Sequence, residues 1–119
     1  MTPEGKVKKA IKELLAEYKI IPADKAGAGL EGDGWYYMPV SASSIGVAGI
    51  PDFIGHYFGR FFAIEAKAPK KKPTGFQALQ IAEIRITGGF CSVIDGRGGL
   101  AELRIWLMRT KLVADGELF

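Results

Sequence analysis

The sequence predicts an α/β fold in which a mixed β-sheet is flanked by helices, in the order α-β-β-β-α-β-α. Two observations predict it. Apolar residues recur at helical spacing near both ends of the chain and again after residue 74, and short runs rich in β-branched and aromatic residues lie between these segments. The chain has 119 residues, of which 48% are hydrophobic and 24% charged, so we expect one folded domain over residues 1–119.

The first predicted element is an amphipathic helix over residues 3–19. Thr2 can cap its N-terminus, and Pro3 suits its first turn. One face of this helix is apolar and is formed by Val7, Ile11, Leu14, Leu15 and Tyr18. After a glycine-rich loop, residues 35–40 have the composition of a short strand, and a second loop of small residues covers 41–49.

The C-terminal half of the chain contains two helices and one strand. Thr74 can cap a helix that extends to about residue 87, and glycines follow it. The predicted apolar stripe of this helix is formed by Phe76, Leu79, Ala82 and Ile86. Residues 90–94 form a predicted strand and residues 100–113 a final helix, which can either cover the sheet or form a dimer seam.

The composition excludes several classes of protein. The longest apolar runs are far shorter than a membrane span, and the N-terminal residues pass directly into a charged helical pattern without a secretory signal. Cys91 is the only cysteine, which excludes an internal disulfide and a multi-cysteine zinc site. Its neighbours Phe90 and Val93 predict a buried thiol rather than a nucleophile. We therefore expect a cytosolic protein.

A hairpin predicted over residues 50–57 and 60–68 brings acidic residues together. Side chains alternate between the two faces of a strand, so Glu65 and Lys67 point the same way. If the two residues between the strands form the turn, counting outward along both strands places Asp52 directly opposite Glu65 and on the same face. Two carboxylates directly opposite each other on neighbouring strands normally repel each other. The pattern therefore predicts a divalent cation between them, and a hard ion such as Mg²⁺ or Mn²⁺ suits oxygen ligands.

The chemistry expected of such a site is metal-dependent hydrolysis of a phosphodiester bond. The predicted metal ligands are Asp52, Glu65 and the backbone carbonyl of Ala66. A metal held there would polarise the phosphate and activate a bound water. Lys67 can orient or deprotonate that water, or offset charge on the phosphate oxygens. Alone, Asp52 is compatible with a turn acid after Pro51, and Glu65 with Lys67 is compatible with an exposed pair, so the catalytic interpretation depends on their combination in one hairpin.

These residues resemble a known motif. Pro51-Asp52 followed by Glu65-Ala66-Lys67 is similar to the signature of the PD-(D/E)XK nuclease superfamily. The wider runs 49–55 and 59–68, and the opening run 2–9, resemble its VRR-NUC branch, in particular the stand-alone phage members. The resemblance covers most of the chain. It implies a restriction-endonuclease-like core, a divalent metal, structure-directed cutting of DNA, and kinship with Holliday junction resolvases, which act as dimers.

The resemblance adds two candidate catalytic residues. Glu4 matches an acidic position on the family's first helix, and Gln77 matches a glutamine that follows the motif in the second helix. Simpler roles are also open, because the helix dipole favours an acid such as Glu4 in a first turn, and Gln77 can be a polar surface residue. Relatives often carry an aromatic or basic group before Pro51, whereas residues 41–49 here are small and uncharged. We therefore expect DNA affinity or junction preference to differ.

The chain has a net charge of +3, and its lysines cluster in two places. The candidate DNA-contacting lysines are Lys6 and Lys9 in the first helix, and Lys70, Lys71 and Lys72 after the hairpin. Such clusters can contact phosphates through a salt-sensitive attraction, or they can form a solvated lysine face. We interpret His56, the only histidine, as structural. Trp35, Tyr36 and Tyr37 could stack on bases, but packing in the strand core is favoured.

The site residues predict a Mg²⁺- or Mn²⁺-dependent nuclease. The resemblance implies that it is a homodimeric endonuclease, phage-encoded and acting in the host cytoplasm, that cuts Holliday junctions or other branched DNA. A nuclease for flaps, nicks or plain duplexes is the enzymatic alternative. The non-enzymatic alternative is a DNA-binding module that keeps the fold without turnover. The intact set of Asp52, Glu65 and Lys67 argues against such a module, because binding alone gains nothing from adjacent carboxylates without a counter-ion.

Overall fold

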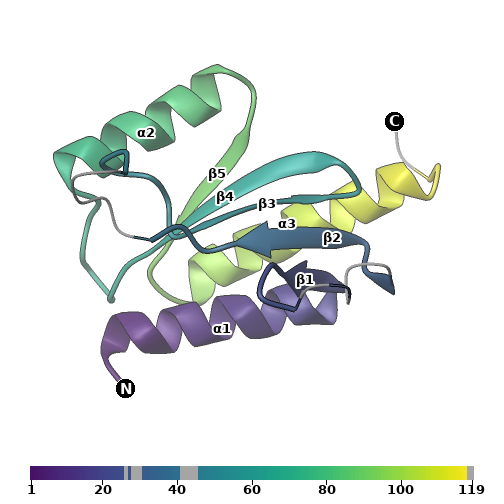
Figure 1. Ribbon diagram of the computed structural model, residues 1–119, viewed down its shortest axis with the longest axis horizontal. Coiled ribbons are helices and arrows are strands. Elements are labelled where there is room, and N and C mark those ends of the chain that lie inside the picture. The colour runs from purple at the N-terminus through teal and green to yellow at the C-terminus, as the bar shows by residue number, and fades with distance from the viewer. Residues whose placement is uncertain (26, 28–30, 41–45, 118–119) are drawn as a thin grey trace.

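The computed structural model describes residues 1–25, 27, 31–40 and 46–117. Its helices and strands, drawn in Figure 1, are α1 (Pro3–Glu17), β1 (Ile20–Pro22), β2 (Gly34–Tyr37), β3 (Phe53–Tyr57), β4 (Arg60–Ala66), α2 (Gly75–Ile86), β5 (Phe90–Ile94) and α3 (Arg97–Ala114). This is the predicted order of elements with one additional strand, β1.

The five strands form one mixed sheet in the order β1-β2-β3-β4-β5. The three central strands β2, β3 and β4 are antiparallel to one another, whereas the edge strands β1 and β5 run parallel to β2 and β4. α1 and α3 pack on one face of the sheet, and α2 packs on the other face beside β5 (Figure 1). The predicted α/β fold with a mixed sheet flanked by helices is confirmed, and it is consistent with a restriction-endonuclease-like core.

The hairpin of β3 and β4 has the predicted register. Tyr57 pairs with Arg60, and the pairing continues to Phe53 opposite Ile64. The two turn residues, Phe58 and Gly59, have φ angles of 48° and 76°, the positive values that a type I′ turn requires at both positions. The right-handed twist of a hairpin favours this turn, so the chain accepts a phenylalanine where asparagine or aspartate is usual.

The main core lies between the sheet and the helices α1 and α3. Its buried side chains include Ile11 and Leu15 of α1, Leu103 and Leu107 of α3, and Phe62, Ile64 and Ala66 of β4. Trp106 of α3 stacks on Phe90 of β5, with ring centroids 4.7 Å apart. The final helix therefore covers the sheet, which is one of the two roles that the sequence left open. Over the described ranges, no helix is both long enough and apolar enough to cross a membrane.

Several element boundaries differ from the predicted ones. α1 ends at Glu17, and Lys19, with a φ of 57°, directs the chain into β1, a short edge strand that the sequence did not predict because it contains Pro22. β2, β3 and β4 are shorter than predicted. α3 begins three residues early, at Arg97, because the glycines that suggested a turn lie in its first helical turn. The loop predicted over residues 41–49 lies outside the described residues at positions 41–45.

The predicted apolar stripe of α2 does not face the sheet, and this prediction was wrong. Ile81 is buried instead, against the small side chains of Ala63 and Cys91, with Ile84 beside it. The stripe of Phe76, Leu79, Ala82 and Ile86, which we call the α2 stripe, is exposed. Apolar residues occur around most of this helix, so helical spacing alone cannot tell which side is buried.

Candidate active site

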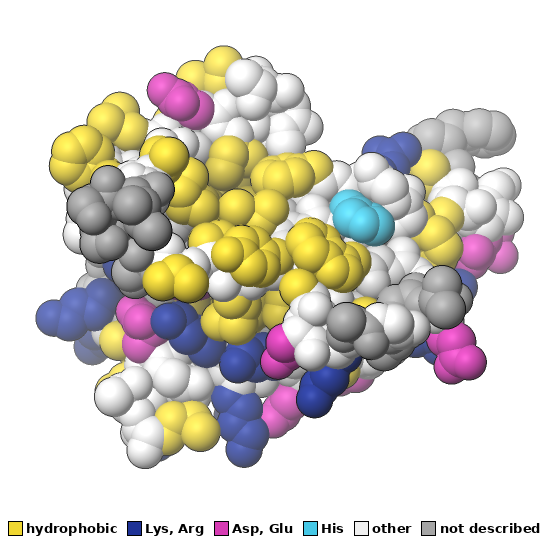
Figure 2. Space-filling model, viewed as in Figure 1, with side chains coloured by type: hydrophobic (Ala, Val, Ile, Leu, Met, Phe, Trp, Pro, Cys, Tyr) yellow, Lys and Arg dark blue, Asp and Glu magenta, His cyan; other side chains and the backbone are white. Residues whose placement is uncertain are grey.

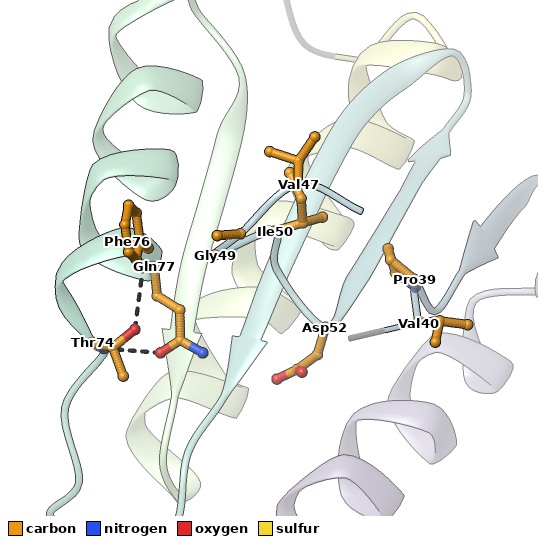
Figure 3. Close-up of a pocket in the computed structure, with 10 residues that line it drawn as sticks. Pro39, Val40, Val47, Gly49, Ile50, Asp52, Thr74, Phe76 and Gln77 are labelled. Atoms are coloured by element: carbon orange, nitrogen blue, oxygen red, sulfur yellow. Dashed lines mark hydrogen bonds between the residues drawn. The ribbon is translucent and has the colours of Figure 1, made fainter. Parts of the chain in front are cut away.

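The predicted site residues meet at the end of the hairpin where β3 begins and β4 ends. Because these strands are antiparallel, the residue before Phe53 lies beside the last residues of β4. The first turns of α1 and of α2 border this end of the sheet. Lys8 of α1 contacts Asp52, and Asp52 lines a cavity of about 260 Å³ together with Thr74 and Gln77 at the start of α2 (Figure 3).

Asp52 is fixed through both of its carboxylate oxygens. Oδ2 accepts a hydrogen bond of 2.9 Å from the backbone N–H of Ala66, and Oδ1 lies 3.8 Å from Nζ of Lys8. The regular strand pairing stops at Phe53 opposite Ile64, one step before Asp52 and Glu65, and the side chain of Asp52 binds the backbone directly after Glu65. The predicted position of Asp52 beside Glu65 is therefore confirmed.

Glu65 is a buried acid with an unsatisfied oxygen. Its side chain is 1% exposed, and Oε2 has no hydrogen-bond partner among the residues that the structure describes. Burial is the largest cause that raises the pKa of Glu65, and the neighbouring carboxyl group of Asp52 is the next, whereas the charge of Lys67 lowers it; together they raise this pKa to about 9. At neutral pH Glu65 therefore retains a proton that an ordinary carboxylate would have released, and a bound cation could take the place of this proton.

The donor atoms at this position fit a hard divalent cation. Two adjacent carboxylates, one with a free oxygen, supply the charge and the oxygen ligands that Mg²⁺ or Mn²⁺ prefers. Among the described residues, no group of three or more histidine, cysteine, aspartate or glutamate side chains is arranged to hold a metal ion. Mg²⁺ commonly keeps several water ligands and needs only one or two carboxylates, so a site formed by Asp52 and Glu65 satisfies this requirement.

Lys67 and Ala66 lie at the end of β4, next to Glu65. The backbone N–H of Lys67 donates a hydrogen bond of 2.9 Å to the carbonyl of Ile94, which continues the parallel pairing of β4 with β5 beyond the strand itself. Lys67 is half-buried, and its charge acts on Glu65. Ala66 is fully buried and uses its N–H for Asp52. Its carbonyl as a metal ligand remains a prediction.

Glu4 is placed beside a lysine that the sequence analysis did not select. Its Oε2 lies 3.4 Å from Nζ of Lys8, one helical turn along α1, and the same ammonium group faces Asp52. The charge of Glu4 also raises the pKa of Glu65, and it is the smallest of the causes of that shift. Glu4 therefore acts on the site from a distance. The four-residue spacing between Glu4 and Lys8 was a signal for their ion pair. Nothing in the sequence pointed to the contact with Asp52.

Gln77 has a structural role at the start of α2. Its Oε1 accepts a 2.9 Å hydrogen bond from the backbone N–H of Thr74, and its own N–H donates to the Thr74 hydroxyl, which together form a capping box. In Figure 3 the side-chain nitrogen of Gln77 points toward the side of the cavity on which Asp52 lies. The capping role accounts for Gln77, and its catalytic role remains a prediction.

The loop that leads to Asp52 packs closely on α2. Gly49 has a φ of 79°, and a Cβ atom at this position would overlap the carbonyl group of Phe76. The side-chain amide of Gln80 also donates a hydrogen bond of 3.4 Å to the carbonyl of Ala48. Glycine is therefore required at position 49, and the first turn of α2 sets the path of the chain into Asp52.

The candidate lysines and two of the three candidate aromatic residues lie on the surface. Lys6 and Lys9 of α1, and Lys70, Lys71 and Lys72 between β4 and α2, are all exposed. Trp35 and Tyr37 are also exposed, which corrects the preference for core packing, whereas Tyr36 is buried as predicted. The Trp35 ring stacks on Tyr37 and on His56, with centroids 6.4 and 6.3 Å away. His56 is thus part of an aromatic surface, in agreement with a structural role.

Cys91 lies in β5 and is buried against Ala63 and Ile81. Burial raises the pKa of its thiol, which opposes formation of the reactive thiolate. The predicted buried thiol in a strand is confirmed.

No protein-family model matches this chain, and no curated protein matches it.

Proposed function

We propose that this chain is a Mg²⁺- or Mn²⁺-dependent endonuclease that hydrolyses phosphodiester bonds in DNA. One observation supports this proposal above all: Asp52 and Glu65 stand side by side on neighbouring chain segments, and Glu65 has a buried oxygen without a partner. A buried, unsatisfied polar atom is rare in folded proteins and favours an explanation by function or by a missing ion. The motif residues that resemble the PD-(D/E)XK signature are the same ones that meet here.

Each residue has a proposed task. Asp52, Glu65 and the Ala66 carbonyl would hold the cation, which when bound would polarise the phosphate and make a water more acidic. The Ala66 N–H keeps the Asp52 carboxylate in place. Lys67, beside Glu65, would either accept a proton from the attacking water or offset negative charge on the phosphate oxygens. Glu4 and Gln77 border this centre and are kept as candidate residues for positioning the substrate or the metal.

Branched DNA is the proposed substrate, with a Holliday junction as the first candidate, and the chain would act on it in the cytoplasm as a homodimer. A symmetric dimer carries two identical sites that can cut opposing strands of a four-way junction. The exposed α2 stripe supports dimerisation, because Phe76, Leu79 and Ile86 are 67%, 62% and 83% exposed. The exposed lysines of α1 and of the segment between β4 and α2 support contact with DNA phosphates.

A cleavage experiment tests the proposal. Wild type and Lys67→Ala are incubated with junction, flap and duplex DNA, in Mn²⁺ or in a chelator. We expect wild type to cut only with metal. Lys67→Ala should cut at least about 100-fold more slowly than wild type, since general base or charge-stabilising groups contribute at least that much. Lys12→Ala, which removes an exposed lysine of α1 away from the acids, is the matched control and should cut like wild type.

Each other outcome favours a different function. Binding of DNA without metal-dependent cutting would indicate a DNA-binding module. Equal cutting of all three substrates would indicate a nuclease for flaps, nicks or duplexes and would remove the junction preference. Cutting by Lys67→Ala at the wild-type rate would show that the proposed role of this lysine is wrong.

A further inference from the structure

Lys8 lies between two acids of the site and has no task in the proposed chemistry. Its Nζ is 3.4 Å from Oε2 of Glu4 and 3.8 Å from Oδ1 of Asp52. Its side chain is 32% exposed, whereas Lys6 and Lys9 on the same helix are exposed to solvent. A lysine on the surface normally extends into water, so its position between two carboxylates, one of them at the start of β3, calls for an explanation.

The two oxygens of Asp52 have different neighbours. Oδ2 accepts the N–H of Ala66, and Oδ1 faces the Lys8 ammonium group. The donor to Oδ2 is a backbone N–H held in the folded hairpin, whereas the group that faces Oδ1 is the end of a flexible side chain, so Oδ1 is the atom with more freedom to bind a cation. A divalent ion at Oδ1 would meet the positive charge of Lys8 at short range. The ion and the ammonium group therefore compete for one oxygen.

The geometry points to Lys8 as a positioning residue with two alternative partners. In the metal-free chain it is the counter-ion of Asp52. When a cation takes over Oδ1, Lys8 is released from Asp52 and contacts a phosphate of the DNA strand at the site. This inference rests on the proposed nuclease function. Glu4, which is one turn away on α1, keeps the ammonium group near the site in both states.

The chemistry of the side chain suits this exchange. Lysine carries a compact charge on a flexible four-carbon chain, so its ammonium group can change partners while α1 stays in place. Phosphate oxygens are strong acceptors for such a charge. Both partners, carboxylate and phosphate, are anionic, so Lys8 is not left without a counter-charge in either state.

The first test measures metal binding without DNA. Titration of wild type, Lys8→Met and Lys12→Met with Mn²⁺ by calorimetry gives three affinities. We expect Lys8→Met to bind Mn²⁺ about two- to fivefold more tightly than wild type, because a competing ion pair of ordinary surface strength is lost. Lys12→Met removes the same charge one turn further along α1 and should stay within about twofold of wild type.

The second test measures the use of DNA at saturating Mn²⁺. Lys8→Met should raise KM about three- to tenfold and leave kcat within about twofold, the result expected when a binding contact equal in substrate and transition state is lost. The slope of log KM against log salt should also fall by about one, because one phosphate contact is missing. Lys8→Arg keeps the charge and should restore both quantities, and circular dichroism of each variant checks that it is folded.

Two results would overturn the inference. Lys8→Met could bind Mn²⁺ no more tightly than Lys12→Met, which would mean that the ammonium group does not compete for Asp52. It could instead show the KM and salt slope of Lys12→Met, which would exclude a phosphate contact. If wild type itself neither binds Mn²⁺ nor cuts DNA, the proposed function fails together with this inference. If wild type does both, failure of the Lys8 tests leaves the nuclease proposal intact.

Discussion

At the scale of single residues, Glu65 is the side chain whose burial costs most. A buried polar atom without a partner costs about 1–3 kcal/mol, and Oε2 of Glu65 is such an atom. Proteins retain arrangements of this kind mainly where function requires them. Without a bound cation the chain is therefore expected to be less stable than it would be with this oxygen satisfied.

The raised pKa of Glu65 makes this cost dependent on pH. The group has an ordinary pKa of 4.5 and a pKa of about 9 in the folded chain. Below pH 4.5 both the folded and the unfolded chain hold the proton. Between these values the unfolded chain loses its proton while the folded chain retains it, so stability falls as the pH rises toward 9.

We predict that Glu65→Gln raises the melting temperature of the metal-free protein by about 5 °C or more at pH 8, because the neutral amide removes this penalty. The melting temperature of the variant should also fall much less between pH 5 and 9 than that of wild type. Thermal unfolding in a chelator, recorded at several pH values, measures both effects. Glu102→Gln, an exposed glutamate on α3, serves as the control. A wild-type curve as flat as that of Glu65→Gln would contradict the prediction.

The sequence predicted the central acids because their relation is local. Alternation along a strand and a two-residue turn are enough to place Asp52 opposite Glu65. The position of Lys8 depends on how α1 packs beside the start of β3, and neither helical spacing nor charge pattern contains that information. The exposure of Trp35 and Tyr37 likewise depends on α2, which covers the sheet only near β5.

At the scale of elements, the contact between the loop at Gly49 and α2 links the helix to the site. The helix begins at a capping box, and its first turn leaves no room for a side chain at position 49. The loop therefore follows one path into Asp52. Displacement of this loop should move the carboxylate away from Glu65.

We predict that Gly49→Ala destabilises the chain by about 1–3 kcal/mol, since the positive φ and the overlap with Phe76 both oppose a Cβ atom. Chemical denaturation measures this change, and metal-dependent cutting should fall with it. Gly98→Ala is the control, because it lies in the first turn of α3 with open space around it and should be neutral or slightly stabilising. Equal stability of the two variants would show that the loop can move without cost.

The sequence predicted most elements because their end signals are strong. Thr2 and Thr74 cap the two helices as expected, and the hairpin and β5 follow the alternation of apolar residues. β1 was missed because its pattern is only three residues long and one of them is Pro22. The prediction of the buried side of α2 was wrong because this helix contacts the sheet only beside β5, and Ile81 and Ile84 are enough to fill this narrow contact.

At the scale of the whole molecule, one face carries most of the exposed apolar side chains. Trp35, Tyr37 and Phe61 lie on the face of the sheet opposite α1 and α3, and the α2 stripe stands beside them. Figure 2 shows hydrophobic side chains gathered in a band across this face, from the region of α2 to the single histidine. Clustered apolar exposure of this kind is typical of surfaces that bind another protein.

We predict that the chain is a dimer in solution and that Leu79→Glu weakens the dimer at least about tenfold, because a charge is placed in an apolar contact. Light scattering after size-exclusion chromatography over a range of concentrations gives the mass. Ile105→Glu introduces the same charge at an exposed apolar position of α3, away from this face, and should remain dimeric. A wild type that is monomeric at all concentrations, or two variants of equal mass, would contradict this use of the α2 stripe.

The tight turn at Phe58 and Gly59 has a consequence for how this chain can vary. It lies at the opposite end of the hairpin from the acids, yet it decides which residue stands across from Glu65. Insertion or deletion of one residue in either strand would rotate Asp52 to the side of α1 and α3. Related chains that keep the acidic pair should therefore differ in hairpin length only by whole pairs of residues, one on each strand. Such a change alters the distance from the turn to the two acids, but the acids still lie opposite each other.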